Sequence, residues 1–421
     1  MSSRDEIWLV DCSLFSAAYD FQLGSALAEG SRPIRLLARP MRPLEVPPPK
    51  DIIYDAYFYR ATEPLMRIRN RWGQKAARLL KGLEHISGLV RLTARVWRER
   101  PLLVHLFWTT LPNADRIAIK LIQKACPVMI TVHNSIPLHG HRPLFNTHDD
   151  YVRVYQQADF LIANAENTRK VMIEWGLDPA RIETITHPPM HLQVSDDEVQ
   201  RKPGRFRVLL WGAIKRYKGV EDLVEAVIRA RKIAPQIELH IVGKLFYDIS
   251  ETIQKVKDQG QEDHITFDLA FKTEEALDAE LQACDLMALP YHEIDASGAF
   301  STSLGYNKAF ILSDVGYFSL LKLPEAVRET AYIQMRDIEA LTRNLVALAT
   351  QPELYKANVE AFEEVNRSYS SWSDVGKSLN AIYDRILAEH GRQALPAPLA
   401  PPQAVAGGRP SAVDQGADAA A

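Results

Sequence analysis

The sequence predicts an α/β protein built from two doubly wound domains that face each other across a cleft. Short apolar runs alternate with longer amphipathic stretches, which is typical of buried parallel strands joined by crossover helices. This alternation occurs twice, before and after a polar stretch at residues 195–205 (SDDEVQRKPGR) that lacks periodicity and contains a Pro-Gly pair. We interpret that stretch as an interdomain linker.

Composition and charge support a globular protein. The chain has 421 residues, 50 Lys and Arg against 53 Asp and Glu, a net charge of −3, and 47% hydrophobic residues. Near-neutral charge argues against a dedicated nucleic-acid binder. Cys12, Cys126 and Cys284 lie too far apart for a zinc or redox motif. Isolated cysteines fit a reducing compartment, so we expect a cytoplasmic protein.

The expected strands follow one another with helical patterns between them. In the first half they are Ile7–Val10, Ile34–Ala38, Ile52–Phe58, Leu102–Phe107, Val128–Val132 and Phe160–Ala163. In the second half they are Val208–Trp211, Leu239–Val242, Ile265–Phe267, Leu286–Leu289 and Phe310–Leu312. An amphipathic helix is expected after Gly219, and another from Ser371 to about Leu387. Doubly wound sheets bind ligands at the carboxyl ends of their strands, so informative residues should directly follow these runs.

These elements predict four parts. The first domain is expected at residues 1–194, the second at 206–368, a further helical segment at 369–390, and a Pro/Ala-rich disordered tail at 391–421. The acidic start of the chain lacks a basic leader and a cleavage site, so a signal peptide is not expected. No run approaches 18 uninterrupted apolar residues, which argues against a membrane span.

Residues 60–100 form a basic segment with interleaved apolar residues. Eleven Lys and Arg residues stand against three acidic ones, a local charge of +8. The pattern favours a basic amphipathic helix. Two interpretations stay open: a solvated basic face on the domain core, or contact of Arg60–Arg100 with an anionic membrane. The second predicts a peripheral protein on the inner face of a membrane.

The most informative motif follows the first strand of the second half. A strand ends at Gly212, a basic loop follows, and Gly219 opens a helix. The loop carries the cations Lys215, Arg216 and Lys218. Amides at the start of the helix and these cations would favour a diphosphate, although surface lysines after such a turn are also common. The Walker pattern GxxxxGK[ST] and the dinucleotide pattern GxGxxG are absent.

Three further strand ends carry polar or glycine residues. Leu239–Gly243 is a strand that ends in Gly, and Lys308–Gly316 ends in Asp-Val-Gly. Between them, Cys284–Gly298 places an acidic loop after a strand. A carboxylate there can accept hydrogen bonds from sugar hydroxyls, and the Ser297-Gly298 step lets the backbone approach a phosphate.

The ordered set of motifs resembles the GT-B glycosyltransferases, in particular the group 1 family (family four), over residues 5–390. In that family a Gly…Lys-Gly strand–loop–helix precedes an Ile-Val-Gly strand, an acidic loop and a strand ending in Asp-x-Gly. The first half agrees, because Val128–Asn134 (VMITVHN) and Ala158–Asn164 (ADFLIAN) resemble the family's strand ends. The resemblance implies Rossmann-like domains, with acceptor in the first and nucleotide-sugar in the second. It also implies that the helix expected at 369–390 crosses back to the first domain.

The resemblance also implies roles for particular residues. The donor-binding residues are Gly212, Lys215, Arg216, Gly243, Ser297 and Gly298. The catalytic residues are His133, Lys218, Glu293 and Asp295. The acceptor-side residues are Asp20, His139 and His141, which with His133 are the candidates for a general base. Lys218, with Lys215 or Arg216, would neutralise the leaving diphosphate, so no metal or other cofactor is expected.

Three departures from the family pattern limit this transfer. The family's Gly-Arg is Gly212-Ala213, so another cation must replace the arginine. The Glu-x7-Glu pattern is incomplete, because its second position falls near Thr302 or Ser303. The usual Gly-Gly loop after the first strand is replaced by Asp11–Asp20 (DCSLFSAAYD). These changes leave the stereochemical outcome open.

Two other site interpretations are weaker. A metal could bind the histidines His133, His139, His141 and His148, but they lack helical pairing, so an acceptor-recognition loop is favoured. The acidic pairs Asp149-Asp150 and Asp196-Asp197 do not end strands and are expected to be solvated.

The resemblance implies transfer of a sugar from a nucleotide donor to a carbohydrate or polyprenyl-linked acceptor. Together with the basic segment 60–100, it implies a role in bacterial exopolysaccharide or cell-surface glycan synthesis. The alternatives are another GT-B chemistry, such as nucleotide-sugar epimerisation, and a non-catalytic binder of sugar nucleotides.

Overall fold

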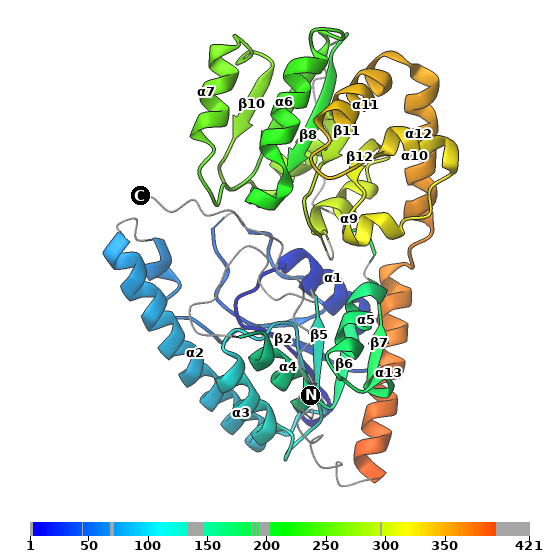
Figure 1. Ribbon diagram of the computed structural model, residues 1–421. Coiled ribbons are helices and arrows are strands. Elements are labelled where there is room, and N and C mark those ends of the chain that lie inside the picture. Colours follow the sequence, from blue (N-terminus) through cyan, green and yellow to red (C-terminus); the bar gives the residue numbers. More distant parts are fainter. Residues whose placement is uncertain are drawn as a thin grey trace, which may run out of the picture.

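The computed structural model describes residues 3–43, 45–67, 71–133, 147–186, 188–190, 192, 203–294 and 297–392. It contains two parallel sheets, one above the other in Figure 1, each with helices on both faces. The predicted fold class is confirmed. All eleven runs expected as strands coincide with strands of the two sheets.

The first sheet has seven strands in the order β3-β2-β1-β4-β5-β6-β7. Its strands are β1 Ile7–Asp11, β2 Ile34–Ala38, β3 Ile53–Ala56, β4 Leu103–Leu106, β5 Val128–Val132, β6 Phe160–Ala163 and β7 Ile182–Thr184. Its helices are α1 Ala17–Ala28, α2 Arg71–Glu99, α3 Pro112–Ile122, α4 His148–Gln157 and α5 Glu166–Glu174. The strand order reverses between β1 and β4, which opens a crevice at the ends of these two strands.

The second sheet has six strands in the order β10-β9-β8-β11-β12-β13. Its strands are β8 Phe206–Trp211, β9 Ile237–Val242, β10 Ile265–Asp268, β11 Leu286–Leu289, β12 Ala309–Ser313 and β13 Tyr332–Ile333. Its helices are α6 Val220–Ala230, α7 Ser250–Asp258, α8 Glu274–Ala283, α9 Gly298–Leu304, α10 Glu325–Ala331, α11 Ile338–Thr350 and α12 Pro352–Arg367. The strand order reverses between β8 and β11. The edge strands β7 and β13 were not predicted, because three and two residues are too short to give a pattern.

Helix α13 (Trp372–Arg392) returns to the first half of the chain, as Figure 1 shows. Its Tyr383 is fully buried, and the Tyr383 hydroxyl lies 2.7 Å from Nδ1 of His105 in β4. At the start of the helix, the indole of Trp372 donates to the carbonyl of Pro189. Helix α13 is therefore fixed to the first sheet at both its start and its middle.

The basic segment contains the long helix α2, on the outer side of the first half (Figure 1). Leu92 and Val96 are fully buried against the first sheet, whereas Leu79 and Val90 remain 69% and 65% exposed. One apolar side thus packs on the core while a second faces solvent. No helix in the described ranges is long and apolar enough to cross a membrane. The expected linker falls largely, and the expected tail almost entirely, outside the described residues.

Candidate active site

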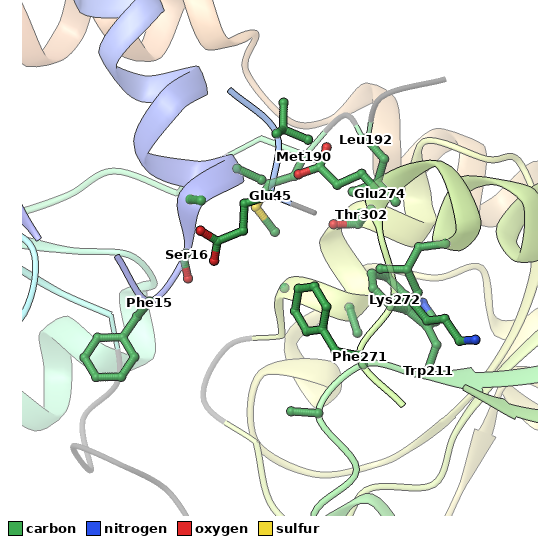
Figure 2. Close-up of a pocket in the computed structure, with 18 of the residues that line it drawn as sticks. Phe15, Ser16, Glu45, Met190, Leu192, Trp211, Phe271, Lys272, Glu274 and Thr302 are labelled. Carbon is green, nitrogen blue, oxygen red and sulfur yellow. The ribbon is translucent and has the colours of Figure 1, made fainter. Parts of the chain in front are cut away.

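Loops that follow β1 and β2 in the first half and β8, β10 and β11 in the second half line a shared cavity of about 460 Å³. The first-half wall includes Leu14, Phe15, Ser16, Ala17, Ala18, Arg39, Arg42, Glu45 and Val46, and Met190 and Leu192 also line the cavity. The second-half wall includes Trp211, Gly212, Lys218, Phe271, Lys272, Ser297, Gly298 and Thr302. Figure 2 shows Phe15, Ser16 and Glu45 on one side of this space and Trp211, Lys272 and Thr302 on the other. The cavity therefore lies where doubly wound sheets bind ligands.

Lys218 is the buried cation of the second-half wall. It ends the single helical turn Arg216–Lys218 between β8 and α6, and it is 4% exposed. Its Nζ donates to the carbonyl of Trp211 at 2.8 Å and lies 5.1 Å from the centre of the Tyr291 ring. Burial lowers the pKa of Lys218 to about 8. The described residues place no carboxylate against it, so an anionic ligand would find a cation that is not neutralised.

Lys215 and Arg216, the other two predicted cations, do not belong to the cavity wall as the described residues form it. The Arg216 guanidinium lies over the ring of Tyr247, 5.1 Å from its centre. Lys215 is half-buried, and burial followed by the nearby charge of Lys218 lowers its pKa. Of the three predicted cations, the structure places Lys218 at the cavity.

Two glycines let the second-half loops meet. A Cβ atom on Gly243 would lie 2.0 Å from the carbonyl oxygen of Gly212, and one on Gly219 would lie 2.1 Å from the carbonyl oxygen of Pro290. Both glycines have positive φ angles, 131° and 68°. Gly243 therefore lies behind Gly212 and supports the wall, whereas Gly212 itself lines the cavity.

The acidic loop after β11 is only partly described. Glu293 is exposed and does not line the cavity among the described residues, and Asp295 lies outside them. Ser297 and Gly298 do line it. The Ser297 hydroxyl caps α9 by accepting a hydrogen bond from the amide of Phe300 at 3.1 Å.

Small hydroxyl side chains occupy the region of the missing second glutamate. Thr302 is 1% exposed and lines the cavity. The Ser303 hydroxyl accepts a hydrogen bond from the indole of Trp211 at 2.8 Å. Trp211, expected to be a core residue, is buried but also lines the cavity. The α9 side of the wall is thus neutral where the family pattern has a carboxylate.

The cations of the first-half wall are paired. The guanidinium of Arg39, 2% exposed, donates to the carbonyl of Ser13 at 2.9 Å and to Glu45 at 2.9 Å. Arg42 donates through its amide to Glu45 at 2.7 Å and through its side chain to Glu63. Burial tends to raise the pKa of Glu45, but the hydrogen bonds from Arg39 and Arg42 outweigh burial and lower it. This network joins the loops after β1 and β2.

His133 directly follows β5 and is not among the described residues that line the cavity. Its ring stacks on Trp108 at 4.4 Å, and its Nδ1 lies 2.8 Å from the side-chain nitrogen of Asn164. Asp20 is fully buried within the first half and does not line the cavity. His139 and His141 lie outside the described residues.

The loop acids and histidines give no metal site within the described residues. His148 contacts the Trp175 ring edge-on, and Asp150 forms a capping box with Thr147 at the start of α4. Asp150 therefore has a structural role. The expectation that the reaction needs no metal stays a prediction.

Several wall residues were missed from the sequence, although a signal was present. Arg39 and Glu45 follow the predicted run Ile34–Ala38, and Phe271 and Lys272 follow the run Ile265–Phe267. All four residues follow strands whose carboxyl ends face the cavity, which is the signal that the sequence contains for them.

Two doubly wound parallel sheets that share one cavity form the arrangement of the GT-B fold. Solved structures agree on the fold. Anabaena Alr3699/HepE, solved with UDP and glucose, has a TM-score of 0.65 at 13% identity, over 90% of this chain and 99% of that one. Sucrose-phosphate synthase from Thermosynechococcus elongatus has a TM-score of 0.66 at 16% identity, over 92% and 100%.

The family follows from the sequence matches. Residues 51–188 match Glycosyltransferase Family 4, and residues 205–351 match Glycosyl transferases group 1. These two matches place the chain in the group 1 glycosyltransferase family. A curated relative is the GDP-mannose:glycolipid 4-beta-D-mannosyltransferase of Xanthomonas campestris pv. campestris, 28% identical over 196 residues. The match covers 45% of this chain and 51%, about half, of that relative.

Proposed function

We propose that this enzyme transfers a hexosyl group from a nucleotide-diphosphate sugar to a carbohydrate or lipid-linked acceptor, in bacterial exopolysaccharide or cell-surface glycan synthesis. The observation that carries the proposal is the shared cavity with Lys218 on its second-half wall. The glycolipid mannosyltransferase named above and the UDP-bound neighbour support the two substrate classes.

Lys218 would stabilise the leaving diphosphate. Negative charge grows on that group as the bond to the sugar breaks, and a preorganised cation in a low-dielectric site stabilises it more than water does. The Lys218 ammonium is buried and fixed by the Trp211 carbonyl before any ligand arrives. Gly212 and Gly298 lie in the same wall and leave room for the diphosphate beside it.

The first-half wall would receive the acceptor. Phe15 and Ser16 line the cavity opposite Lys218, and Phe15 is 52% exposed. An exposed aromatic ring suits contact with the apolar face of a sugar ring. His133, behind Trp108, remains a candidate for the residue that receives the acceptor proton.

A lipid-linked acceptor agrees with the outer surface of α2 and α3. Exposed apolar side chains gather there: Leu79, Leu83, Ile86, Val90, Trp97, Ile117 and Leu121. Exposed cations surround them: Arg78, Arg91, Arg98, Arg116, Lys120 and Lys124. We call these two sets the α2–α3 surface. An apolar stripe with basic flanks matches an anionic lipid interface, which would bring the acceptor to the cavity.

The test measures release of the nucleotide diphosphate with UDP-, GDP- and dTDP-sugars, chosen by thermal shift, with and without a membrane extract as the source of acceptor. A true donor raises the melting temperature by mass action. We expect release that depends on acceptor and a labelled sugar in the lipid or glycan fraction. Consumption of donor without acceptor would instead indicate epimerisation or hydrolysis.

A further inference from the structure

Two aspartates are buried together beneath the first-half wall. Asp11 ends β1, Asp20 lies in the first turn of α1, and both are fully buried. Their side chains lie within hydrogen-bonding distance of each other. A buried carboxylate normally requires a cation or several donors, so the proton content of this pair needs an explanation.

The Asp11 carboxylate accepts hydrogen bonds from two backbone amides. One carboxylate oxygen accepts from the amide of Ser13 at 3.0 Å, and the other accepts from the amide of Phe15 at 2.7 Å. Leu14 between them has a φ of 46°, in the left-handed region that a leucine rarely adopts. The bonds from Asp11 therefore hold the loop after β1 in a strained conformation.

Asp20 has no such donors. Among the described residues, no amide, hydroxyl or cation donates to either of its carboxyl oxygens. Two ionised carboxylates cannot hydrogen bond, because neither has a proton to give. Burial, and then the negative charge of Asp11, raise the pKa of Asp20 well above its usual value.

We propose that Asp20 is a positioning residue that keeps its proton and donates it in a hydrogen bond to Asp11. Asp11 in turn holds the amides of Ser13 and Phe15, and so fixes the loop that forms the first-half wall. Asp20 is then not the general base, because it is buried away from the cavity and already protonated. Only the activity measurements below rest on the proposed function, whereas the urea and infrared measurements do not.

Three other ionisable groups among the described residues interact electrostatically with the pair, and they do not titrate in the range of the test. Cys12 lies beside Asp11, Tyr19 precedes Asp20 in α1, and Tyr54 faces both aspartates from β3. Burial raises the pKa of each of these three groups. Arg39, which donates to the carbonyl of Ser13, keeps its charge through Glu45.

The first experiment compares urea unfolding of the wild type and Asp20→Asn from pH 5 to 8, without substrate. Asp20 is protonated when folded and ionised when unfolded, so the wild type loses stability as pH rises toward the raised pKa. Its unfolding equilibrium constant should rise about tenfold per pH unit relative to Asp20→Asn, which needs no proton. Parallel pH dependences would overturn the proposal.

The second experiment separates positioning from catalysis. Asparagine keeps a donor for Asp11, so Asp20→Asn should lose less than about tenfold in turnover at neutral pH. Asp20→Leu has a similar volume but no donor, and it should raise the KM for acceptor while leaving donor affinity unchanged. A loss of about a hundredfold or more in Asp20→Asn would instead identify a proton-transfer role. An inactive wild type would count against the proposed function and leave the urea result standing.

A third measurement covers the case in which the variants do not fold. The infrared spectrum of the wild type at neutral pH should contain the carbonyl band of a protonated carboxylic acid, which disappears on unfolding. Absence of that band from the folded wild type would overturn the proposal without any variant.

Discussion

On the second-half wall, Lys218 is a buried cation whose hydrogen bond goes to a carbonyl, whereas on the first-half wall Arg39 and Arg42 are each held by a glutamate. A buried cation without a counterion is costly, as the lowered pKa of Lys218 shows. A cation paired with a glutamate is stable, but the carboxylate already neutralises its charge, so it attracts an anionic ligand only weakly. The second-half wall is therefore suited to an anion, and the first-half wall to a neutral, hydroxyl-bearing group.

The same contrast holds for the two lysines of the second-half wall. Lys272 also lines the cavity, but it forms an ion pair with Asp268, four residues earlier. Position in the wall alone thus does not make a cation available for the donor. Burial of Lys218 and its distance from described carboxylates distinguish it from its neighbour.

The largest effect should come from Lys218→Met, which removes the cation and keeps much of the side-chain volume. We expect kcat/KM for the donor to fall by about 10²–10³, the effect of losing one preorganised charge-stabilising group. The melting temperature at pH 7 should not fall, because burial of the Lys218 charge costs stability below its pKa of about 8. Steady-state kinetics and a thermal scan check both.

Lys272→Met is the matched control and should lose less than tenfold. In the wild type, kcat/KM should also decline as pH rises through about 8, because Lys218 then loses its proton. Unchanged kinetics in Lys218→Met would show that Lys218 does not stabilise the leaving diphosphate, and that the two walls do not differ in the way described above.

A smaller effect should follow from Glu45→Gln on the first-half wall. The change leaves the buried Arg39 guanidinium without its carboxylate, and breaking a buried pair costs about 3 kcal/mol or more. Because Arg39 also holds the carbonyl of Ser13, we expect the KM for acceptor to rise about tenfold. Donor affinity should not change. Calorimetry and separate donor and acceptor titrations measure the three quantities.

Glu63→Gln provides the comparison, since its partner Arg42 is 48% exposed and solvent screens the pair. It should cost no more than about 1 kcal/mol. Equal losses of donor and acceptor affinity in Glu45→Gln would show that the two walls do not serve separate substrates.

The sequence predicted the sheets well because buried parallel strands give continuous apolar runs, and every run became a strand. It also singled out Gly212, Lys218, Ser297 and Gly298 in the loops that follow β8 and β11, and all four line the cavity. These positions depend on local chain order, which a sequence displays directly.

The sequence could not predict which residues distant in the chain lie together in the fold. The family pattern singles out Lys218 but does not decide between Lys215 and Arg216, and the packing of the described residues places neither of these two in the cavity wall. Asp20 looked like an available base, but the fold buries it beside Asp11. The pair between Arg39 and Glu45 likewise forms only once the loop after β2 folds back on itself.

The smallest effect concerns the outer surfaces of the two halves. The proposed function places the contact with an anionic membrane on the α2–α3 surface of the first half and not on the second half. Leu83→Ser with Val90→Ser removes two exposed apolar side chains of the α2–α3 surface. We expect about tenfold weaker binding to vesicles of anionic lipid, because each substituted side chain no longer buries apolar surface in the interface.

Replacing Arg78 and Arg91 by Gln should weaken vesicle binding by about 1 kcal/mol per charge, and added salt should have the same effect on the wild type. Ile233→Ser, an equally exposed apolar residue of the second half, is the control and should bind like the wild type. Equal vesicle binding by all these variants would mean that the lipid-linked acceptor reaches the cavity without the α2–α3 surface.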